Sequence, residues 1–299
     1  MKDDAGSRPL RLGVSAAAGG FWFVSLAPVI VAGSGVHGAA MAFWRCWIGL
    51  AVVGVIALLR KEMRWEHLRM AVPAGLCFGA SIGLFFWASQ ITSIANASLI
   101  TVLQPIVLMA GARLRFGELV TSRDVLWAFV AIAGAVVLVL AGDSTGTGDI
   151  RGDLLATISI VVGAGYFILG RRVLETVPVF AFMTGMFTSA GVLLGLAVIA
   201  SGVDLSPATG ADWARVAGVA LLPGIGHVLL NVAQNGAPLN LIGVIQLLVP
   251  VNATLLAFWF LNQSVTPLQL VGMVIVITAL TIQTRLRSRG APAAAPNTK

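Results

Sequence analysis

The sequence predicts an all-α membrane protein of ten transmembrane helices, arranged as two inverted five-helix repeats. Three observations lead to this prediction. The chain is 58% hydrophobic and only 10% charged, whereas a soluble domain has about 25% charged residues. Its apolar residues fall into long runs separated by short polar breaks. One pattern of apolar runs, polar residues and prolines occurs in both halves of the chain.

The apolar runs have the length that a bilayer requires. About 20 helical residues cross a hydrocarbon core of roughly 30 Å. By this measure the spans are expected at residues 12–33, 38–59, 68–90, 94–112, 125–142, 152–170, 178–200, 213–235, 239–261 and 267–284. Gly236, Pro238 and Asn240 separate the eighth and ninth spans without a charge. A single kinked helix is the alternative there, but about 49 residues would overshoot the bilayer.

The two ends of the chain are polar. Residues 1–11 carry Lys2, Arg8 and Arg11 before the first apolar run, as a signal peptide would. The run is longer than a signal-peptide core and further spans follow, so we expect the segment to be retained on the cytoplasmic side. Residues 285–299 contain Ala-Pro repeats and are expected to form a disordered cytoplasmic tail.

The basic residues predict the orientation in a cytoplasmic membrane. With the N-terminus in the cytoplasm, 16 of the 19 Lys and Arg residues lie in inside segments, two lie outside and Arg45 lies within a span. Both termini are therefore expected inside. Five spans per half, 12–142 and 152–284, require the second half to be inverted. The net charge of +7 is thus a topology signal and predicts no nucleic-acid partner.

The repeat is seen when residues 85–121 are aligned with residues 230–266 at a constant offset of 145. Pro105 then falls on Pro250, Glu118 on Gln263, and Thr121 on Thr266. The alternative is a chance match between two apolar segments. We interpret the shared pattern as two copies of one unit, with a binding site where they meet.

Polar residues in the eighth span predict one wall of a central cavity. His227, Asn231 and Gln234, with Asn235 at the inner end, lie on one face of that helix. Uncompensated polar groups are costly in hydrocarbon, so this face must meet protein or water. Hydrogen bonding between helices is the alternative to a cavity.

Other spans supply further candidate cavity residues. Trp22 and Tyr166 correspond at an offset of 144, and Ser25 and Phe85 lie on the first and third spans. Pro105 and Pro250 each free the carbonyl four residues earlier, which belongs to Thr101 and Gln246. Gln104 lies beside them, and packing alone is the alternative reason for the two prolines.

Arg45 lies about 10 Å inside the second span at 1.5 Å per residue. An intramembrane arginine is a functional candidate, but it could instead snorkel or hold its helix in place. The interior of the spans contains no Asp or Glu, and His227 is their only histidine. A carboxylate proton relay is therefore not expected, and His227 is the candidate proton carrier if transport is coupled to protons.

No enzyme signature is present in the sequence. It has no phosphate-binding loop, no nucleophile elbow and no zinc-binding histidine pair, and Cys46 and Cys77 both lie in apolar runs. We expect neither a metal nor a cofactor.

Ten helices in two repeats, each with a mid-helix proline and a polar turn 13 residues later, resemble the EamA-type drug/metabolite transporters. The similar residues are Leu103-Gln104-Pro105 to Gly117-Glu118, Leu248-Val249-Pro250 to Asn262-Gln263, Arg45, and Gly152-Asp153-Leu154. Asn262-Gln263 departs from the usual Gly-Glu of the second repeat. The resemblance implies a central cavity lined by helices one, three, four, six, eight and nine.

The predicted function is secondary transport of a small neutral or zwitterionic metabolite, such as an amino acid, by alternating access. Export is implied by the resemblance alone. A membrane receptor or assembly partner that binds a ligand without moving it is the alternative. The expected partners are a small-molecule substrate and the lipid bilayer, with the protein a monomer or a homodimer.

Overall fold

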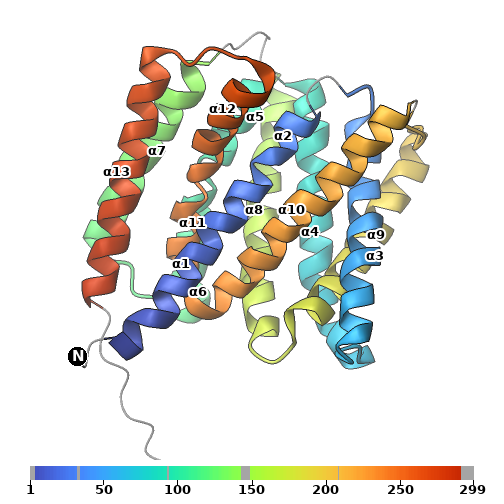
Figure 1. The fold of residues 1–299 in the computed structure, drawn as a ribbon, viewed down its shortest axis with the longest axis horizontal. Coiled ribbons are helices and arrows are strands. Elements are labelled where there is room, and N and C mark those ends of the chain that lie inside the picture. Colours follow the sequence, from blue (N-terminus) through green and yellow to red (C-terminus); the bar gives the residue numbers. More distant parts are fainter. Residues whose placement is uncertain (1–3, 32–33, 93, 143–148, 208, 291–299) are drawn as a thin grey trace, which may run out of the picture.

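The computed structural model describes residues 4–31, 34–92, 94–142, 149–207 and 209–290. All regular elements in these ranges are helices, which lie side by side in one bundle (Figure 1). They are α1 (Asp4–Val24), α2 (Leu26–Val31), α3 (Gly38–Leu59), α4 (Trp65–Ile91), α5 (Ile94–Thr101), α6 (Gln104–Phe116), α7 (Ser122–Leu140), α8 (Ile150–Leu174), α9 (Val179–Ser201), α10 (Gly210–Gly236), α11 (Leu239–Ile245), α12 (Leu248–Leu261) and α13 (Pro267–Gly290).

Ten segments of the described chain are long and apolar enough to cross a membrane, which confirms the predicted number of spans. Three of them consist of two helices each: α1 with α2, α5 with α6, and α11 with α12. The eighth and ninth spans are separate, since α10 ends at Gly236 and α11 begins at Leu239. The alternative of one long kinked helix is therefore wrong.

Several helices extend beyond the apolar runs that predicted them, because polar residues continue or cap their ends. Arg113 and Arg115, expected in a turn, form the last turn of α6, where cations interact favourably with the helix dipole. Residues 285–290, expected in the tail, continue α13, and the remaining tail lies outside the described residues. The N-terminal segment is helical from Asp4.

The two prolines lie where the fourth and ninth spans are broken. Pro105 follows the break between α5 and α6, and Pro250 follows the break between α11 and α12. A proline has no N–H and its ring clashes with the carbonyl four residues earlier, so the helix cannot continue unchanged. The Gln246 carbonyl does not remain free, since it accepts a hydrogen bond of 2.8 Å from the Val249 N–H.

The same end structures recur in the two halves at the offset of 145. Gly117 ends α6 and Asn262 ends α12, each in the left-handed conformation, with φ of 62° and 52°. Thr121 and Asp124 then cap each other's backbone N–H groups at the start of α7. Thr266 and Gln269 make the same two hydrogen bonds at the start of α13. Such reciprocal capping satisfies N–H groups that would otherwise lack partners.

The helices pack in pairs from opposite halves of the chain. The most extensive contacts are those of α4 with α8 and α9, of α1 with α10, and of α7 with α13. Figure 1 shows α7 and α13 at one side of the bundle and α3 and α9 at the other. In the same view, α1 begins and α13 ends at the same end of the bundle.

Candidate functional site

A cavity of about 140 Å³ lies among helices from both halves of the chain. Its wall comes from α1, α4, α6, α8, α10 and the break between α11 and α12. The lining residues are Phe21, Val24, Phe78, Ser81, Gln104, Gly163, Tyr166, Phe167, His227, Leu230 and Gln246. The wall is thus largely aromatic and aliphatic, with amide, hydroxyl and imidazole groups at a few places.

Phe78 is the centre of the aromatic part of this wall. Its ring centroid lies 4.9 Å from that of His227, in an edge-on arrangement, and 5.2 Å from that of Tyr166. On another side it contacts Phe187 at 5.9 Å. Edge-on and tilted contacts at these distances are favourable for aromatic rings, so they hold Tyr166 and His227 in place.

Tyr166 is also held by a buried hydrogen-bond network with α10. Its hydroxyl donates to Asn231 Oδ1 at 2.8 Å, and Gln234 Nε2 donates to the same oxygen at 3.0 Å. Asn231 Nδ2 and Gln234 Oε1 have no partner within the described part of the chain. Buried polar groups in proteins are almost always paired, and neither residue lines the cavity, so ordered water is the partner expected for these two atoms.

A hydrogen bond in the cavity wall joins the two halves of the chain. Gln246 Nε2, at the break between α11 and α12, donates to Gln104 Oε1 at the start of α6 at 2.7 Å. Gln246 Oε1 and His227 Nδ1 lack partners among the described residues. The cavity wall therefore carries unsatisfied polar atoms beside apolar rings, an arrangement typical of small-molecule sites.

Arg45 is buried behind this wall. The side chain is 7% exposed, and its guanidinium carbon lies 5.8 Å from the centroid of the Phe78 ring. The burial is inconsistent with snorkelling to the membrane surface. Arg45 makes no ion pair or hydrogen bond with any residue that the structure describes, and its Nε is among the unpartnered buried atoms.

The structure places four predicted residues in the cavity wall and the others elsewhere. Gln104, Tyr166, His227 and Gln246 line the cavity. Asn231 and Gln234 reach it only through Tyr166. The remaining four do not line it: Trp22 contacts Trp259, the Ser25 hydroxyl donates to the Phe21 carbonyl, the Thr101 hydroxyl donates to the Ser98 carbonyl, and Phe85 contacts Phe86. Asn235 is exposed.

The alignment of the two halves contained a signal for one wall residue that we missed. At the offset of 145, Tyr166 corresponds to Phe21, and both line the cavity. At the offset of 144, Tyr166 corresponds to Trp22, which contacts Trp259 and does not line the cavity. Phe78 and Phe167 were also missed, because an apolar side chain in an apolar span does not show which side of the helix faces a cavity.

A charged network lies away from this cavity, at the loop that joins α6 to α7. Glu118 accepts hydrogen bonds from the backbone N–H groups of Leu239 at 2.9 Å and Asn240 at 3.1 Å, at the start of α11. Arg171, at the end of α8, lies 3.7 Å from Glu118 and donates to the Ala237 carbonyl. Glu118 therefore connects this loop to α8 and α11.

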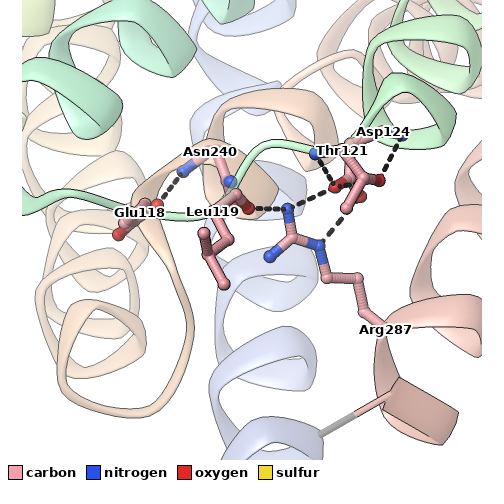
Figure 2. A network of polar contacts seen from close by, with 6 residues as sticks. All are labelled: Glu118, Leu119, Thr121, Asp124, Asn240 and Arg287. Atoms are coloured by element: carbon pink, nitrogen blue, oxygen red, sulfur yellow. Dashed lines mark hydrogen bonds and ion pairs between the residues drawn. The ribbon is translucent and has the colours of Figure 1, made fainter.

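The same loop is also tied to the last helix. Arg287 on α13 makes two hydrogen bonds to the Asp124 carboxylate, at 2.8 and 2.9 Å, and one to the Leu119 carbonyl (Figure 2). At the offset of 145, Glu118 corresponds to Gln263 in the second half, which is exposed and makes no side-chain hydrogen bond among the described residues. Charged contacts of this kind are thus confined to one of the two corresponding loops.

The described residues contain no group of three or more His, Cys, Asp or Glu side chains that could hold a metal ion. A wider hollow of about 230 Å³ lies beside α6 and α7. Apart from Arg113, its lining consists of apolar side chains. It offers little for the recognition of a polar solute.

A bundle of ten membrane-spanning helices around a small, partly polar cavity is the architecture of a membrane transporter. The sequence model of the EamA-like transporter family matches residues 11–140 and 150–285. The chain belongs to the EamA-like transporter family.

Individual relatives agree with this assignment. The chain is 26% identical over 251 residues to the uncharacterized transporter YyaM of Bacillus subtilis, covering 80% of this chain and 82% of that protein. It is 23% identical over 225 residues to an uncharacterized transporter of Haemophilus influenzae, covering 72% of each chain. A solved crystal structure superposes with a TM-score of 0.80 at 21% identity, over 94% of this chain and 99% of that one, and shows the same fold.

Proposed function

We propose that this membrane transporter is a secondary transporter that exports a small neutral or zwitterionic metabolite, such as an amino acid. The observation that carries the proposal is a cavity whose wall combines the amides of Gln104 and Gln246 with the rings of Phe78, Tyr166 and His227. Its apolar rings suit the hydrocarbon part of a solute, and its unpartnered amide and imidazole atoms suit the polar part.

The proposed mechanism is alternating access between two inverted repeats, in a cytoplasmic membrane with both termini inside. The distribution of Lys and Arg supports this orientation. The matching helix breaks and caps in the two halves support the repeat. The orientation assigns the Glu118 and Arg287 contacts to the cytoplasmic end, where they tie the loop between α6 and α7 to α8, α11 and α13. Opening toward the cytoplasm then requires these contacts to break.

Solute flux in proteoliposomes tests the proposed function. Each amino acid is tested separately. Vesicles that contain the purified protein and a high internal concentration of one unlabelled amino acid should accumulate the labelled form of that amino acid by exchange. Vesicles without protein give the baseline. Saturable binding of an amino acid without exchange would contradict transport and favour the receptor alternative.

Glu118→Ala should favour the state that is open to the cytoplasm. The change removes two hydrogen bonds to a charged acceptor, each worth about 1.5–3 kcal/mol. Since about 1.4 kcal/mol changes an equilibrium tenfold, the population of that state should rise roughly tenfold or more. The reference protein lacks Cys46 and Cys77 and carries Ser81→Cys in the cavity wall. The measurement is the rate at which this cysteine reacts with an impermeant thiol reagent in inside-out vesicles, with and without Glu118→Ala.

Gln263→Ala is the matched control for Glu118→Ala, because it changes the corresponding loop of the other repeat without removing a described contact. It should leave the labelling rate of Ser81→Cys at the reference value. Equal rates in the Glu118→Ala protein and the reference protein would show that these contacts do not hold the cytoplasmic end closed.

A further inference from the structure

The charge of Arg45 has no counter-ion in the described structure. The residue lies on α3 within the membrane-spanning part of the bundle, and no carboxylate among the described residues lies within ion-pair distance. A buried charge without a partner is costly in a medium of low polarity. Its contact with Phe78 compensates only part of that cost, because a cation–π contact is weaker than an ion pair.

The position of Arg45 relates it to the cavity. Its guanidinium lies over Phe78, whose ring forms part of the cavity wall and contacts His227 and Tyr166. The positive charge therefore lies next to a wall residue of the cavity where we propose that the solute binds.

We propose that Arg45 provides the counter-charge for a carboxylate on the transported solute, so that the site takes zwitterions with one carboxylate in preference to neutral solutes. This inference rests on the proposed function in calling the ligand a substrate. One fixed cation balances one negative charge, and in an interior of low polarity the charge of Arg45 acts on the cavity across the Phe78 ring without direct contact. A doubly charged phosphate would leave one negative charge unbalanced, because the interior of the described spans offers no second Lys or Arg.

The cavity also limits the hydrocarbon part of the solute. Its volume of about 140 Å³ is close to that of an engineered apolar cavity of about 150 Å³ that binds benzene. A branched alkyl group or a single ring fills such a space. For a zwitterion, the acceptor Gln246 Oε1 lies in the cavity wall, has no other partner among the described residues and suits the ammonium group.

The test is equilibrium binding to the full-length protein in detergent, with three probes of similar size. The probes are 4-methylpentanoate, its neutral amide 4-methylpentanamide, and leucine. The wild-type protein should bind both carboxylates roughly 10- to 100-fold more tightly than the amide, because a nearby buried charge without a counter-ion attracts the anionic group. Arg45→Gln should lose this preference, and Arg45→Lys should keep part of it, because it retains the positive charge.

A second measurement distinguishes binding from a structural role. Arg45→Gln removes an unpaired buried charge, so the ligand-free variant should unfold at a temperature no lower than that of the wild type. A clearly lower unfolding temperature, equal affinity of the wild type for acid and amide, or no binding of any probe would each overturn the assignment. A carboxylate preference that depends on Arg45, without flux in proteoliposomes, would uphold this inference and contradict the proposed transport.

Discussion

Gly226→Val is expected to abolish most of the folded protein, whereas Gly224→Val, two residues earlier on α10, should leave it intact. A Cβ atom at position 226 would lie 2.7 Å from the carbonyl oxygen of Gly20 on α1 and 3.0 Å from Val24. The first neighbour is backbone, which cannot rotate away, so α1 and α10 would have to separate. Overpacking costs about 1–3 kcal/mol where side chains can adjust, and occasionally more.

Gly224 provides a matched control on the same helix. A Cβ atom there meets nothing within 4 Å, while the loss of glycine and the gain of a β-branched residue are the same as at position 226. The measurement is the yield of monodisperse protein in detergent and its unfolding temperature. Equal yields and unfolding temperatures for the two variants would show that the approach of α1 to α10 is not needed for folding.

Asn231→Leu is expected to reduce solute flux at least roughly tenfold. Asn231 is fully buried, and its Oδ1 accepts hydrogen bonds from both Tyr166 and Gln234. Leucine has a similar size but no acceptor, so two buried donors lose their partner, at a cost of about 1–3 kcal/mol each. Tyr166 lines the cavity, and its hydroxyl would turn toward another acceptor. The measurement is the initial exchange rate per reconstituted protein molecule.

Two further variants separate recognition from packing. Asn235→Leu makes the same substitution at an exposed position of α10 and should exchange at the wild-type rate. Adding Tyr166→Phe to Asn231→Leu removes one of the two stranded donors, so it should recover part of the lost stability but not the flux. If the double variant recovers both, the network is needed for packing and not for transport.

The positions of the spans were predictable from the sequence because they depend on local properties. Twenty apolar residues in a row determine that a segment enters the membrane, whatever lies beside it. Pro105 and Pro250 locate the helix breaks, since the missing N–H and the ring clash act within one turn. The ends were less accurate, because residues such as Arg113, Arg115 and Asp124 extend a helix beyond its apolar part.

The cavity was only partly predictable, because it depends on how helices face one another. The polar face of α10 was visible as a pattern, and His227 does line the cavity. Thr101 and Ser25 are also polar, but the hydroxyl of each donates to a backbone carbonyl three or four residues earlier in the same span. Such local hydrogen bonds compete with a role in a cavity wall, and the sequence does not indicate which will form.

The sequence alone determined that this chain is a ten-span membrane protein, since transfer into the bilayer depends on each segment separately. Only the tertiary structure decided which residues meet. Glu118 binds backbone N–H groups 121 and 122 residues further along the chain, and backbone groups are the same at every position except proline. Gly226 and Gly224 are identical as residues, yet only at Gly226 would an added Cβ atom meet another helix within 4 Å. The difference lies in the crossing of α1 with α10, which is a property of the packed bundle.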